Sequence, residues 1–366
     1  MKITNIEIET LHVTERADWT FVHINTDQDI RGLGELNPSV RRADALGTFH
    51  TMAEQLIGRD PRQIERINAL FDPQTLDRFG FRALSALDQA LWDILGKSLG
   101  APVYQLLGGL CRDEIRLYAN INRATRTDRS PEAFARNAAA AVADGFDAVK
   151  LAPFDGMARG IDKAEDAKDG LACMRAVRAA IGPDVDLLID CHSHFTARGA
   201  LAVADALFEL DLFWFEEPVP DTDIEGYLEV KARSGLPVAG GESRLHRRGF
   251  WEIFDRGGLD IAMPDVTVVG GLSELSKVAA MAETRDILTA PHGPFGPVTT
   301  AASAHAMAAR PAFLILEYAW GEASWRHDLV LPTETINKGR IALSDAPGLG
   351  VELNPDTVAA HRIEIS

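Results

Sequence analysis

Residues 185–191 read VDLLIDC, residues 212–217 read LFWFEE and residues 236–242 read LPVAGGE. Each stretch is a short apolar run, the composition of a strand that is buried on both faces of a parallel sheet. Each run ends in an acidic residue, and these residues, Asp190, Glu216 and Glu242, follow one another at intervals of 26 positions. Such an interval holds one strand and one helix, so we expect the three carboxylates side by side on adjacent strands.

The same rhythm continues on both sides of this region. The further runs are IRLYANI at 115–121, FDAVKLA at 146–152, LDIAMPD at 259–265, DILTAPH at 286–292 and FLILEY at 313–318. Helix signals fill the gaps: Ser130 suits an N-cap, Pro131 suits the first helical position, and Gly145 suits the residue after a helix end. Eight such units predict a TIM-type α/β barrel. A doubly wound sheet is the weaker alternative, because the usual glycine-rich first turn is missing.

The N-terminal part has a different order, in which strands precede helices. An extended run begins near the N-terminus, Gly32 and Gly34 punctuate a further strand, and residues 84–100 carry apolar side chains at helical spacing. This order predicts a small α+β domain. The predicted division is an α+β domain over 1–113, the barrel over 114–334, and a turn-rich C-terminal segment over 335–366 that returns to the first domain.

Composition and charge exclude several classes of protein. The 366 residues carry a net charge of −17, with 46% hydrophobic and 25% charged residues, as in globular proteins. This charge repels nucleic acids and anionic lipids, so an anion site needs its own local positive charge, for example from a metal. The three cysteines form no CxxC pair, which argues against a disulfide framework or a zinc cluster. Neither a signal peptide nor a membrane span is indicated, and we expect a cytoplasmic location.

The predicted strand ends carry the chemistry, because the active sites of TIM barrels lie at the C-terminal ends of the strands. One such residue alone is uninformative, since barrels also cap strands with polar groups for solubility. Seven ionisable residues at successive strand ends predict an active site. They are Lys150, Asp190, Glu216, Glu242, Asp265, His292 and Glu317.

The three evenly spaced carboxylates indicate a metal site. Converging carboxylates repel one another and raise one another's pKa values unless a cation neutralises them. Ligation by oxygen alone favours Mg²⁺ over zinc or copper. The alternative is that Asp190, Glu216 and Glu242 form salt bridges with neighbouring Lys and Arg side chains.

His192 and His194 follow the first of these carboxylates. Positions i and i+2 share a strand face, so His192 is expected in the same cavity as Asp190, where an acid/base group would be useful. The alternative is a histidine that caps the strand. His194 either touches substrate or lines a loop.

Asp265, His292 and Glu317 end the later strands. An Asp beside a His fixes the imidazole tautomer and raises its basicity, and the alternative is a structural hydrogen bond. Glu317 is a candidate acid or hydrogen-bond donor beside a developing oxyanion. Its alternative is a surface carboxylate paired with Arg326.

Several segments together resemble the enolase superfamily in its mandelate racemase-like subgroup, over essentially the whole chain. They are ALSALDQALWDILGKSLGAPVYQLLGG, LLIDCHSHF, WFEEPV, AGGES, MPDVTVVGG and PGLGVELN. The resemblance implies a (β/α)7β barrel with an α+β N-terminal capping domain. It also implies Mg²⁺ held by Asp190, Glu216 and Glu242, a carboxylate substrate, and removal of the proton α to the carboxylate to give a metal-stabilised enediolate.

The sequence departs from the racemases at the end of the second strand. Racemases of the subgroup carry Lys-x-Lys there, whereas this chain has Lys150-Leu151-Ala152, and Ala152 cannot accept a proton. His192 and the string PHGPFGP at 291–297 instead resemble galactonate dehydratase and related acid-sugar dehydratases. The resemblance therefore implies elimination of water to give a 2-keto-3-deoxy sugar acid.

In this hypothesis His292, oriented by Asp265, abstracts the C2 proton and His192 protonates the departing hydroxyl, although the two histidines could exchange roles. Lys150 and Mg²⁺ stabilise the enediolate. Further candidates for substrate contact are Arg244 and Asn122, and we expect residues 14–50 to close over the sugar.

Other functions remain open. A racemase, an epimerase or a cycloisomerase shares the enediolate without losing water. A metal-dependent hydrolase or a non-catalytic sugar-acid binder is more remote. The sugar acid and its stereochemistry are not encoded in a motif. We expect a small-molecule substrate and, because similar proteins assemble, a homo-oligomer.

Overall fold

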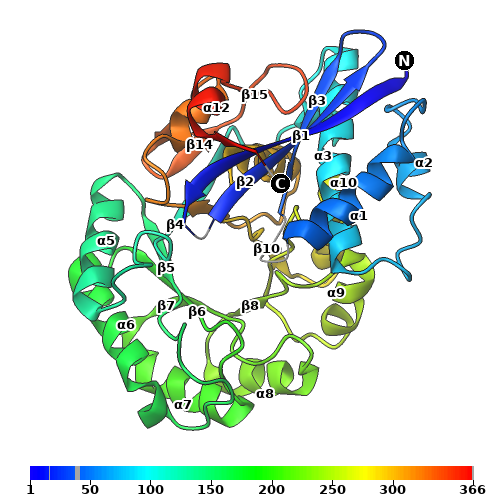
Figure 1. Cartoon of the computed structure of the whole chain (residues 1–366). Coiled ribbons are helices and arrows are strands. Elements are labelled where there is room, and N and C mark those ends of the chain that lie inside the picture. The colour runs from blue at the N-terminus through cyan, green and yellow to red at the C-terminus, as the bar shows by residue number, and fades with distance from the viewer. Residues whose placement is uncertain (16, 38–41, 365–366) are drawn as a thin grey trace.

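The structure is a computed structural model, and it describes residues 1–15, 17–37 and 42–364. Its central feature is a ring of parallel strands enclosed by helices, and the N-terminal strands and helices lie against one side of this ring (Figure 1). The predicted α/β barrel with an α+β N-terminal domain is confirmed.

The N-terminal domain combines an antiparallel sheet with helices. Its strands are β1 (Ile3–Thr14), β2 (Ala17–Thr26) and β3 (Arg31–Leu36). Its helices are α1 (Arg42–Glu54), α2 (Ile64–Asn68), α3 (Arg78–Leu99) and α4 (Val103–Leu106). Buried side chains such as Val22, Phe49 and Leu87 form a core of their own between the sheet and the helices.

Helix α3 packs directly on β3, and the two glycines of β3 make this approach possible. A Cβ atom on Gly32 would lie 2.2 Å from the carbonyl oxygen of Ala90. One on Gly34 would lie 2.2 Å from the carbonyl oxygen of Ala86. Glycines inside a strand therefore mark a close contact with another backbone here.

The ends of α3 explain why it is longer than the predicted segment 84–100. Asp77 is the N-cap, and its side chain accepts a hydrogen bond from the Gly80 amide at 2.8 Å. Gly100 ends the helix with a φ of 65°. Gly80 in the first turn weakens the helical pattern of the sequence, so the predicted segment begins after that turn.

Eight parallel strands form the barrel, and each of the eight predicted apolar runs overlaps one of them. They are β4 (Glu114–Asn120), β5 (Ala148–Leu151), β6 (Asp186–Asp190), β7 (Leu212–Glu216), β8 (Val238–Gly240), β9 (Ile261–Ala262), β10 (Leu288–Thr289) and β11 (Leu316–Ala319). β11 pairs with β4, and a bridge between Thr289 and Phe313 closes the ring.

A helix follows each of the first seven barrel strands. These helices are α5 (Pro131–Ala143), α6 (Lys168–Ile181), α7 (Ala197–Leu207), α8 (Ile224–Ser234), α9 (His246–Asp255), α10 (Gly271–Glu283) and α11 (Pro297–Ala308). The next helix after β11 is a short 3₁₀ helix, η3 (Arg326–Leu329). The other two 3₁₀ helices, η1 (Ala164–Ala167) and η2 (Phe208–Leu210), lie in earlier connections. The order is therefore (β/α)7β.

The ends of α5 are those that the sequence predicts. Ser130 is the N-cap and its hydroxyl accepts a hydrogen bond from the Ala133 amide at 3.2 Å. Pro131 occupies the first helical position, and Gly145 follows the helix with a φ of 96°.

The C-terminal segment consists of short strands and one helix. They are β12 (Val330–Leu331), β13 (Ile336–Asn337), β14 (Arg340–Ala342), β15 (Glu352–Leu353), α12 (Pro355–His361) and β16 (Arg362–Ile363). β16 pairs antiparallel with β1, and β14 pairs antiparallel with β4. The end of the chain, red in Figure 1, thus lies beside the N-terminal sheet.

Helix α3 also holds the N-terminal domain to the barrel. The Ser85 hydroxyl accepts hydrogen bonds from the amides of Gly270 and Gly271 at 2.9 and 3.1 Å. Asp88 accepts one from the Ser273 amide at 2.9 Å. These contacts satisfy amides at the start of α10, which otherwise lack partners inside the helix.

Two further observations concern the cysteines and the possibility of a membrane span. All three cysteines are free. In the ranges that the structure describes, none of the helices has the length and apolar character that spanning a membrane would require.

Candidate active site

The side chains that fill the barrel interior also place the functional residues. Tyr118, Ala148, Leu188, Trp214 and Ile315 belong to one buried cluster inside the ring. Two positions after each of them stands a polar residue, and alternation along a strand puts both on the same face. These polar residues are Asn120, Lys150, Asp190, Glu216 and Glu317. The site therefore forms the next layer above the barrel core.

Lys150 is completely buried among carboxylates. Its Nζ atom lies 2.8 Å from Glu216 Oε1, 2.9 Å from Glu317 Oε1 and 3.7 Å from Asp190 Oδ2. Burial by itself lowers the pKa of Lys150, but the charges of Glu216 and Glu317 outweigh it and raise the pKa well above its ordinary value. A fixed positive charge thus lies beside the acidic cluster. The alternative that we considered for these carboxylates was a salt bridge with a neighbouring Lys or Arg. Such a pair is present between Lys150 and Glu216 and, at a longer distance, between Lys150 and Asp190.

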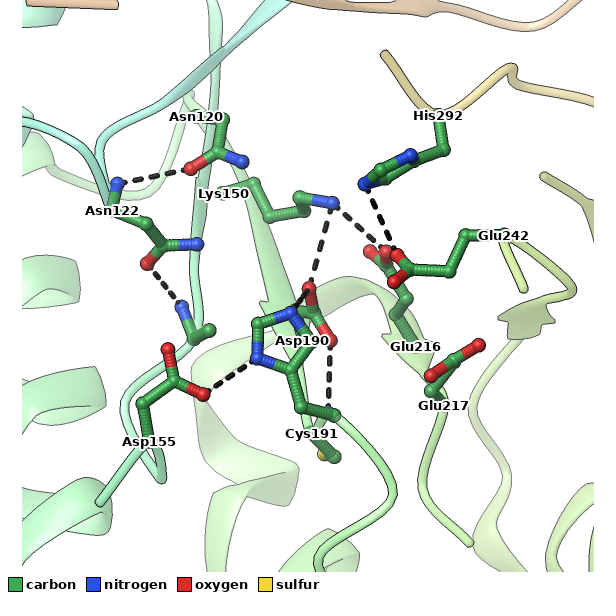
Figure 2. A network of polar contacts seen from close by, with 12 residues as sticks. Asn120, Asn122, Lys150, Asp155, Asp190, Cys191, Glu216, Glu217, Glu242 and His292 are labelled. Carbon is green, nitrogen blue, oxygen red and sulfur yellow. Dashed lines mark hydrogen bonds and ion pairs between the residues drawn. The ribbon is translucent and has the colours of Figure 1, made fainter. Parts of the chain in front are cut away.

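Asp190 and Glu216 stand directly opposite each other on β6 and β7. Glu242 lies near Asp190, since ligand atoms of these two residues are within 4.8 Å of each other, and Figure 2 draws it with Asp190 and Glu216. Burial and the charge of Asp190 raise the pKa of Glu216 to about 8, although Lys150 offsets part of the rise. Glu216 also accepts a hydrogen bond from the Trp214 indole at 2.9 Å. The carboxylates of this cluster together carry more negative charge than the neighbouring cationic side chains neutralise.

A divalent cation suits this cluster. Ligand atoms of Asp190, His192 and Glu242 lie within 4.8 Å of one another. Glu242 Oε2 is buried and makes no hydrogen bond in the part of the chain that the structure describes. Carboxylate oxygens are the ligands that Mg²⁺ prefers. Glu216, which the sequence predicts as a ligand, is not in this set of three, and its two oxygens contact Lys150 and Trp214.

His292 is held by Asp265 at the opposite side of the cluster from β6. Its Nδ1 atom donates to Asp265 Oδ2 at 2.8 Å, and its Nε2 atom lies 3.2 Å from Glu242 Oε2. The other oxygen of Asp265 accepts hydrogen bonds at 2.7 Å from the amide and the hydroxyl of Thr267. Asp265 is therefore fixed in place, and it fixes the tautomer of His292 with Nε2 directed at the acidic cluster.

His192 has the same arrangement, with a partner that the sequence analysis missed. Its Nδ1 atom donates to Asp155 Oδ1 at 2.6 Å, and its Nε2 atom lies 2.9 Å from Asp190 Oδ2. Asp155 lies in the connection after β5, four residues beyond Leu151, the last residue of that strand. It is not part of the apolar run, so the sequence gives only a weak signal for it, an acidic residue in a turn after Pro153. In Figure 2, Asp155 and His292 lie on opposite sides of the acidic cluster.

The predicted alternation along a strand does not explain the position of His192. β6 ends at Asp190, and His192 and Ser193 have φ angles of 42° and 59°. The alternation of an extended strand does not continue to His192. A left-handed turn, rare for residues other than glycine, brings the ring back towards Asp190, and the His192 amide donates to Asp190 Oδ1 at 3.0 Å.

Both histidines have raised pKa values. Burial lowers the pKa of His192, but the charge of Asp190 and the hydrogen bond to Asp155 raise it to about 12. Burial also lowers the pKa of His292, but the charges of Glu242 and Glu317 raise it to about 10. These carboxylates are the cause, so a cation bound to them would lower both pKa values.

Glu317 is completely buried rather than on the surface. Burial raises its pKa, but the charges of Lys150 and His292 lower it to about 2. Its oxygens accept hydrogen bonds from the Asn120 amide at 2.7 Å and the Gly293 amide at 2.9 Å. Arg326, the surface partner considered above, pairs with Glu334 instead. In the structure Glu317 is a hydrogen-bond acceptor and a partner of Lys150, and its predicted role as an acid or hydrogen-bond donor beside an oxyanion stays a prediction.

The remaining candidates have varied positions. Asn122 lines the site, and its side-chain oxygen accepts a hydrogen bond from the Ala152 amide at 2.7 Å. His194 is buried and its Nδ1 atom is 2.9 Å from the carbonyl oxygen of Cys191. Arg244 forms an ion pair with Asp221 at 2.8 Å. These partners favour structural roles for His194 and Arg244, and their substrate contacts stay predictions.

The site opens into a cavity of about 560 Å³, a size that is usual for pockets that bind small molecules. Its lining includes Asp190, His192, Glu242 and His292 together with the arginines Arg123, Arg126 and Arg129 of the connection after β4. Thr14 of β1 accepts a hydrogen bond from one of these arginines, Arg126. The rest of the expected closing region, 14–50, includes residues 16 and 38–41, which lie outside the described residues.

Comparisons with known proteins agree with this geometry. Residues 133–357 match the family model "Enolase C-terminal domain-like", and residues 5–108 match "Mandelate racemase / muconate lactonizing enzyme, N-terminal domain". A D-galactonate dehydratase from Ralstonia nicotianae is 38% identical over 83% of this chain and 78% of its own. A D-galactarolactone cycloisomerase from Agrobacterium fabrum is 34% identical over 98% of this chain and 95% of its own.

A crystal structure of a mandelate racemase/muconate lactonizing enzyme from a Jannaschia species superposes with a TM-score of 0.91. It is 31% identical and the match covers 100% of this chain and 99% of that one. The chain therefore belongs to the enolase superfamily, in its mandelate racemase/muconate lactonizing enzyme family.

Proposed function

We propose that the protein is a Mg²⁺-dependent acid-sugar dehydratase that converts a sugar acid into its 2-keto-3-deoxy product. The observation that carries this proposal is the pair of Asp-held histidines, His192 and His292, whose Nε2 atoms both face one acidic cluster. Elimination of water needs one group that removes a proton and another that donates one. The similarity to a D-galactonate dehydratase supports the same reaction class.

Asp190, Glu216 and Glu242 are the residues that would hold the cation. When bound, Mg²⁺ would withdraw electron density from the substrate carboxylate and make the adjacent C–H bond more acidic. Lys150 adds a fixed ammonium group beside the same cluster. Because it is completely buried, its charge acts with little screening by water and stabilises the negative charge that develops on the substrate carboxylate.

His292 is the base in this scheme. Asp265 holds Nδ1, so Nε2 is the nitrogen that accepts the C2 proton, and Asp265 then stabilises the imidazolium that forms. His192 is the acid. Asp155 holds its Nδ1, so Nε2 is the nitrogen that donates a proton to the C3 hydroxyl, which leaves as water. The enol that remains tautomerises to the 2-keto acid. Asp155 and Asp265 are positioning residues.

Exchange of the C2 proton with solvent deuterium tests this assignment. His292→Asn is expected to abolish the exchange, and His192→Asn is expected to keep it while losing water elimination. His327→Asn is the matched control, because that side chain is 54% exposed and remote from the acidic cluster. Exchange that persists in His292→Asn and disappears in His192→Asn would show that the two histidines have the opposite roles.

The cation is tested by removing it. After treatment with a chelator, Mg²⁺ is expected to restore formation of the 2-keto acid, and Zn²⁺ is not, because the cluster consists of hard oxygen ligands. Activity that persists without a divalent cation would refute the metal assignment.

A cycloisomerase or racemase is the second candidate, favoured by the similarity to a D-galactarolactone cycloisomerase. Both alternatives use the same proton abstraction without loss of water. A screen of sugar acids with Mg²⁺ separates them, because only the dehydratase forms a 2-keto acid. The expectation of a homo-oligomer stays a prediction.

A further inference from the structure

Glu217 is a buried carboxylate at the mouth of the barrel that the proposed mechanism does not use. It directly follows Glu216, the last residue of β7, and only 5% of its surface is exposed. Its Oε2 atom accepts a hydrogen bond from the Ser193 hydroxyl at 3.3 Å. Its Oε1 atom is buried and has no hydrogen bond within the described ranges. A buried carboxylate oxygen without a partner costs free energy, so this atom favours a binding partner from outside the chain.

The charges around Glu217 are acidic. The four that act on it most strongly are all negative, and they belong to Glu242, Asp190, Asp221 and Glu216. Figure 2 draws Glu217 with three of these residues at the ends of β6, β7 and β8. Asp221 is paired with Arg244 at 2.8 Å. A cation near the other carboxylates would therefore be attracted by Glu217 as well as by the predicted ligands.

A second buried group without a partner lies in the same region. Tyr227 on α8 is completely buried, and its hydroxyl makes no hydrogen bond to any residue that the structure describes. A Cβ atom on Gly240 would lie 2.8 Å from this hydroxyl, so the hydroxyl lies against the end of β8, two residues before Glu242. Glu217 is the charged group that acts on it most strongly. A donor and an acceptor that both lack partners beside an acidic cluster indicate a region that holds water or an ion.

The backbone of Glu217 ties it to the turn that carries His192. Glu217 has a φ of 39° and Ser193 a φ of 59°, in the left-handed region that residues other than glycine rarely adopt. The Ser193 amide donates to the Glu217 carbonyl at 2.8 Å, and the Glu217 amide donates to the Ala239 carbonyl of β8 at 3.0 Å. These two bonds fix Glu217 between β8 and the turn after β6, beside the predicted cation ligands.

We propose that Glu217 is a positioning residue of the cation site, whose charge and free oxygen help to hold a divalent cation from outside its direct ligands. This inference rests on the proposed function, which assigns the cation to Asp190, Glu216 and Glu242. Groups around the direct ligands of a metal commonly change its affinity about 10- to 100-fold. Glu217 is outside the group of residues whose ligand atoms converge, which agrees with an indirect role.

Binding of Mg²⁺ to the native chain and to Glu217→Gln tests the proposal. Both proteins are treated with a chelator, and MgCl₂ is then titrated in by calorimetry without substrate. Gln has the shape of Glu and keeps an oxygen that can accept from Ser193, so the substitution mainly removes the charge. We expect Glu217→Gln to bind Mg²⁺ about 10- to 100-fold more weakly than the native chain does. An affinity within about 2-fold of the native value would overturn the proposal.

Two control variants separate the charge from a local disturbance. Ser193→Ala removes the hydroxyl that contacts Glu217 and keeps the carboxylate, so we expect it to bind Mg²⁺ with the native affinity. Glu283→Gln removes a carboxylate at the last residue of α10, where one oxygen is also buried without a hydrogen bond in the described part of the chain. It too should keep the native affinity. If either control weakens binding as much as Glu217→Gln does, the charge of Glu217 is not the cause and the proposal is refuted.

A second substitution covers the case in which Glu217→Gln does not fold. Glu217→Met fills a similar volume without a buried charge, and such replacements are often neutral for stability. We expect the same loss of Mg²⁺ affinity, and native affinity in this variant would equally refute the proposal. For a variant that folds but is less stable, the rise in melting temperature caused by Mg²⁺ gives the same comparison, because it depends on the affinity of the folded state.

Mg²⁺ binding without substrate keeps this inference separate from the dehydratase proposal. If Glu217→Gln binds Mg²⁺ more weakly but no sugar acid yields a 2-keto acid, the inference stands and the dehydratase proposal fails. If sugar acids are dehydrated and both proteins bind Mg²⁺ equally, the inference fails and the dehydratase proposal stands. A native chain that binds no Mg²⁺ would refute the cation site and the role of Glu217 with it.

Discussion

Glu35 links the N-terminal domain to the barrel in a way that can be measured. It lies on β3, is buried, and accepts hydrogen bonds from the amides of Gly296 and Thr299 at 2.6 and 2.9 Å. These amides belong to the first turn of α11, which directly follows the segment that carries His292. The carboxylate thus caps a barrel helix from another domain.

Burial makes this cap dependent on pH. It raises the pKa of Glu35 from 4.5 to about 7, and the hydrogen bonds from Thr299 and Gly296 offset only part of the rise. Between pH 4.5 and 7 the folded state binds more protons at this site than the unfolded state. The contribution of Glu35 to stability is therefore fully present below pH 4.5 and is lost as the pH rises through 7. The difference between the two pKa values corresponds to about 3 kcal/mol.

Glu35→Gln keeps the shape of the side chain and cannot ionise. We expect it to match the native chain near pH 4.5 and to be more stable by about 3 kcal/mol at pH 8.5. With an unfolding entropy of about 2.1 cal/mol/K per residue, this difference raises the melting temperature of the 366-residue chain by about 4 °C. Scanning calorimetry at both pH values measures it, and Glu54→Gln, an exposed position on α1, is the control.

One result would refute this reasoning. If Glu35→Gln is less stable than the native chain by the same amount at both pH values, the ionised carboxylate is the better cap. The attraction between its charge and the start of α11 would then outweigh the effect of burial.

Three further predictions concern other contacts. Gly34→Ala should destabilise the chain by about 4 kcal/mol or more, because its Cβ would lie 2.2 Å from a helix carbonyl oxygen. Gly47→Ala should stabilise the chain by about 0.5–1 kcal/mol, because its Cβ would meet nothing within 4 Å. Urea unfolding of the two variants measures both effects. Asp155→Asn should lower turnover about 10- to 1000-fold while C2 proton exchange continues, because Asp155 holds only the proposed acid, His192. Loss of turnover and of C2 proton exchange together would contradict the assignment. Burial lowers the pKa of His305 from 6.5 to about 4. Between these pH values the folded state binds fewer protons at this side chain than the unfolded state does. About 3 kcal/mol of stability should therefore be lost on acidification through that range. His305→Gln should remove this part of the pH dependence, and an unchanged pH profile of the urea midpoint would contradict it.

The barrel and the strand-end residues of the candidate site were predictable from the sequence, because both depend on local periodicity. A short apolar run predicts a buried strand, and the spacing between runs predicts the helix that follows it. The last residues of the runs then point to the barrel mouth. In this way Lys150, Asp190, Glu216 and Glu317 were identified before the structure was known, and their positions in one polar layer follow from the alternation of side chains along a strand.

Only the tertiary structure decided which of these groups contact one another. Asp155 holds His192 because a left-handed turn after β6 brings the ring to a connection 37 residues earlier in the sequence. Lys150 pairs with Glu317 because closure of the ring brings β11 next to β4, the neighbour of β5. Glu35 caps α11 across a separation of 261 residues. Periodicity describes neighbours within one element, whereas these contacts depend on how loops and domains pack, and no local pattern records that packing.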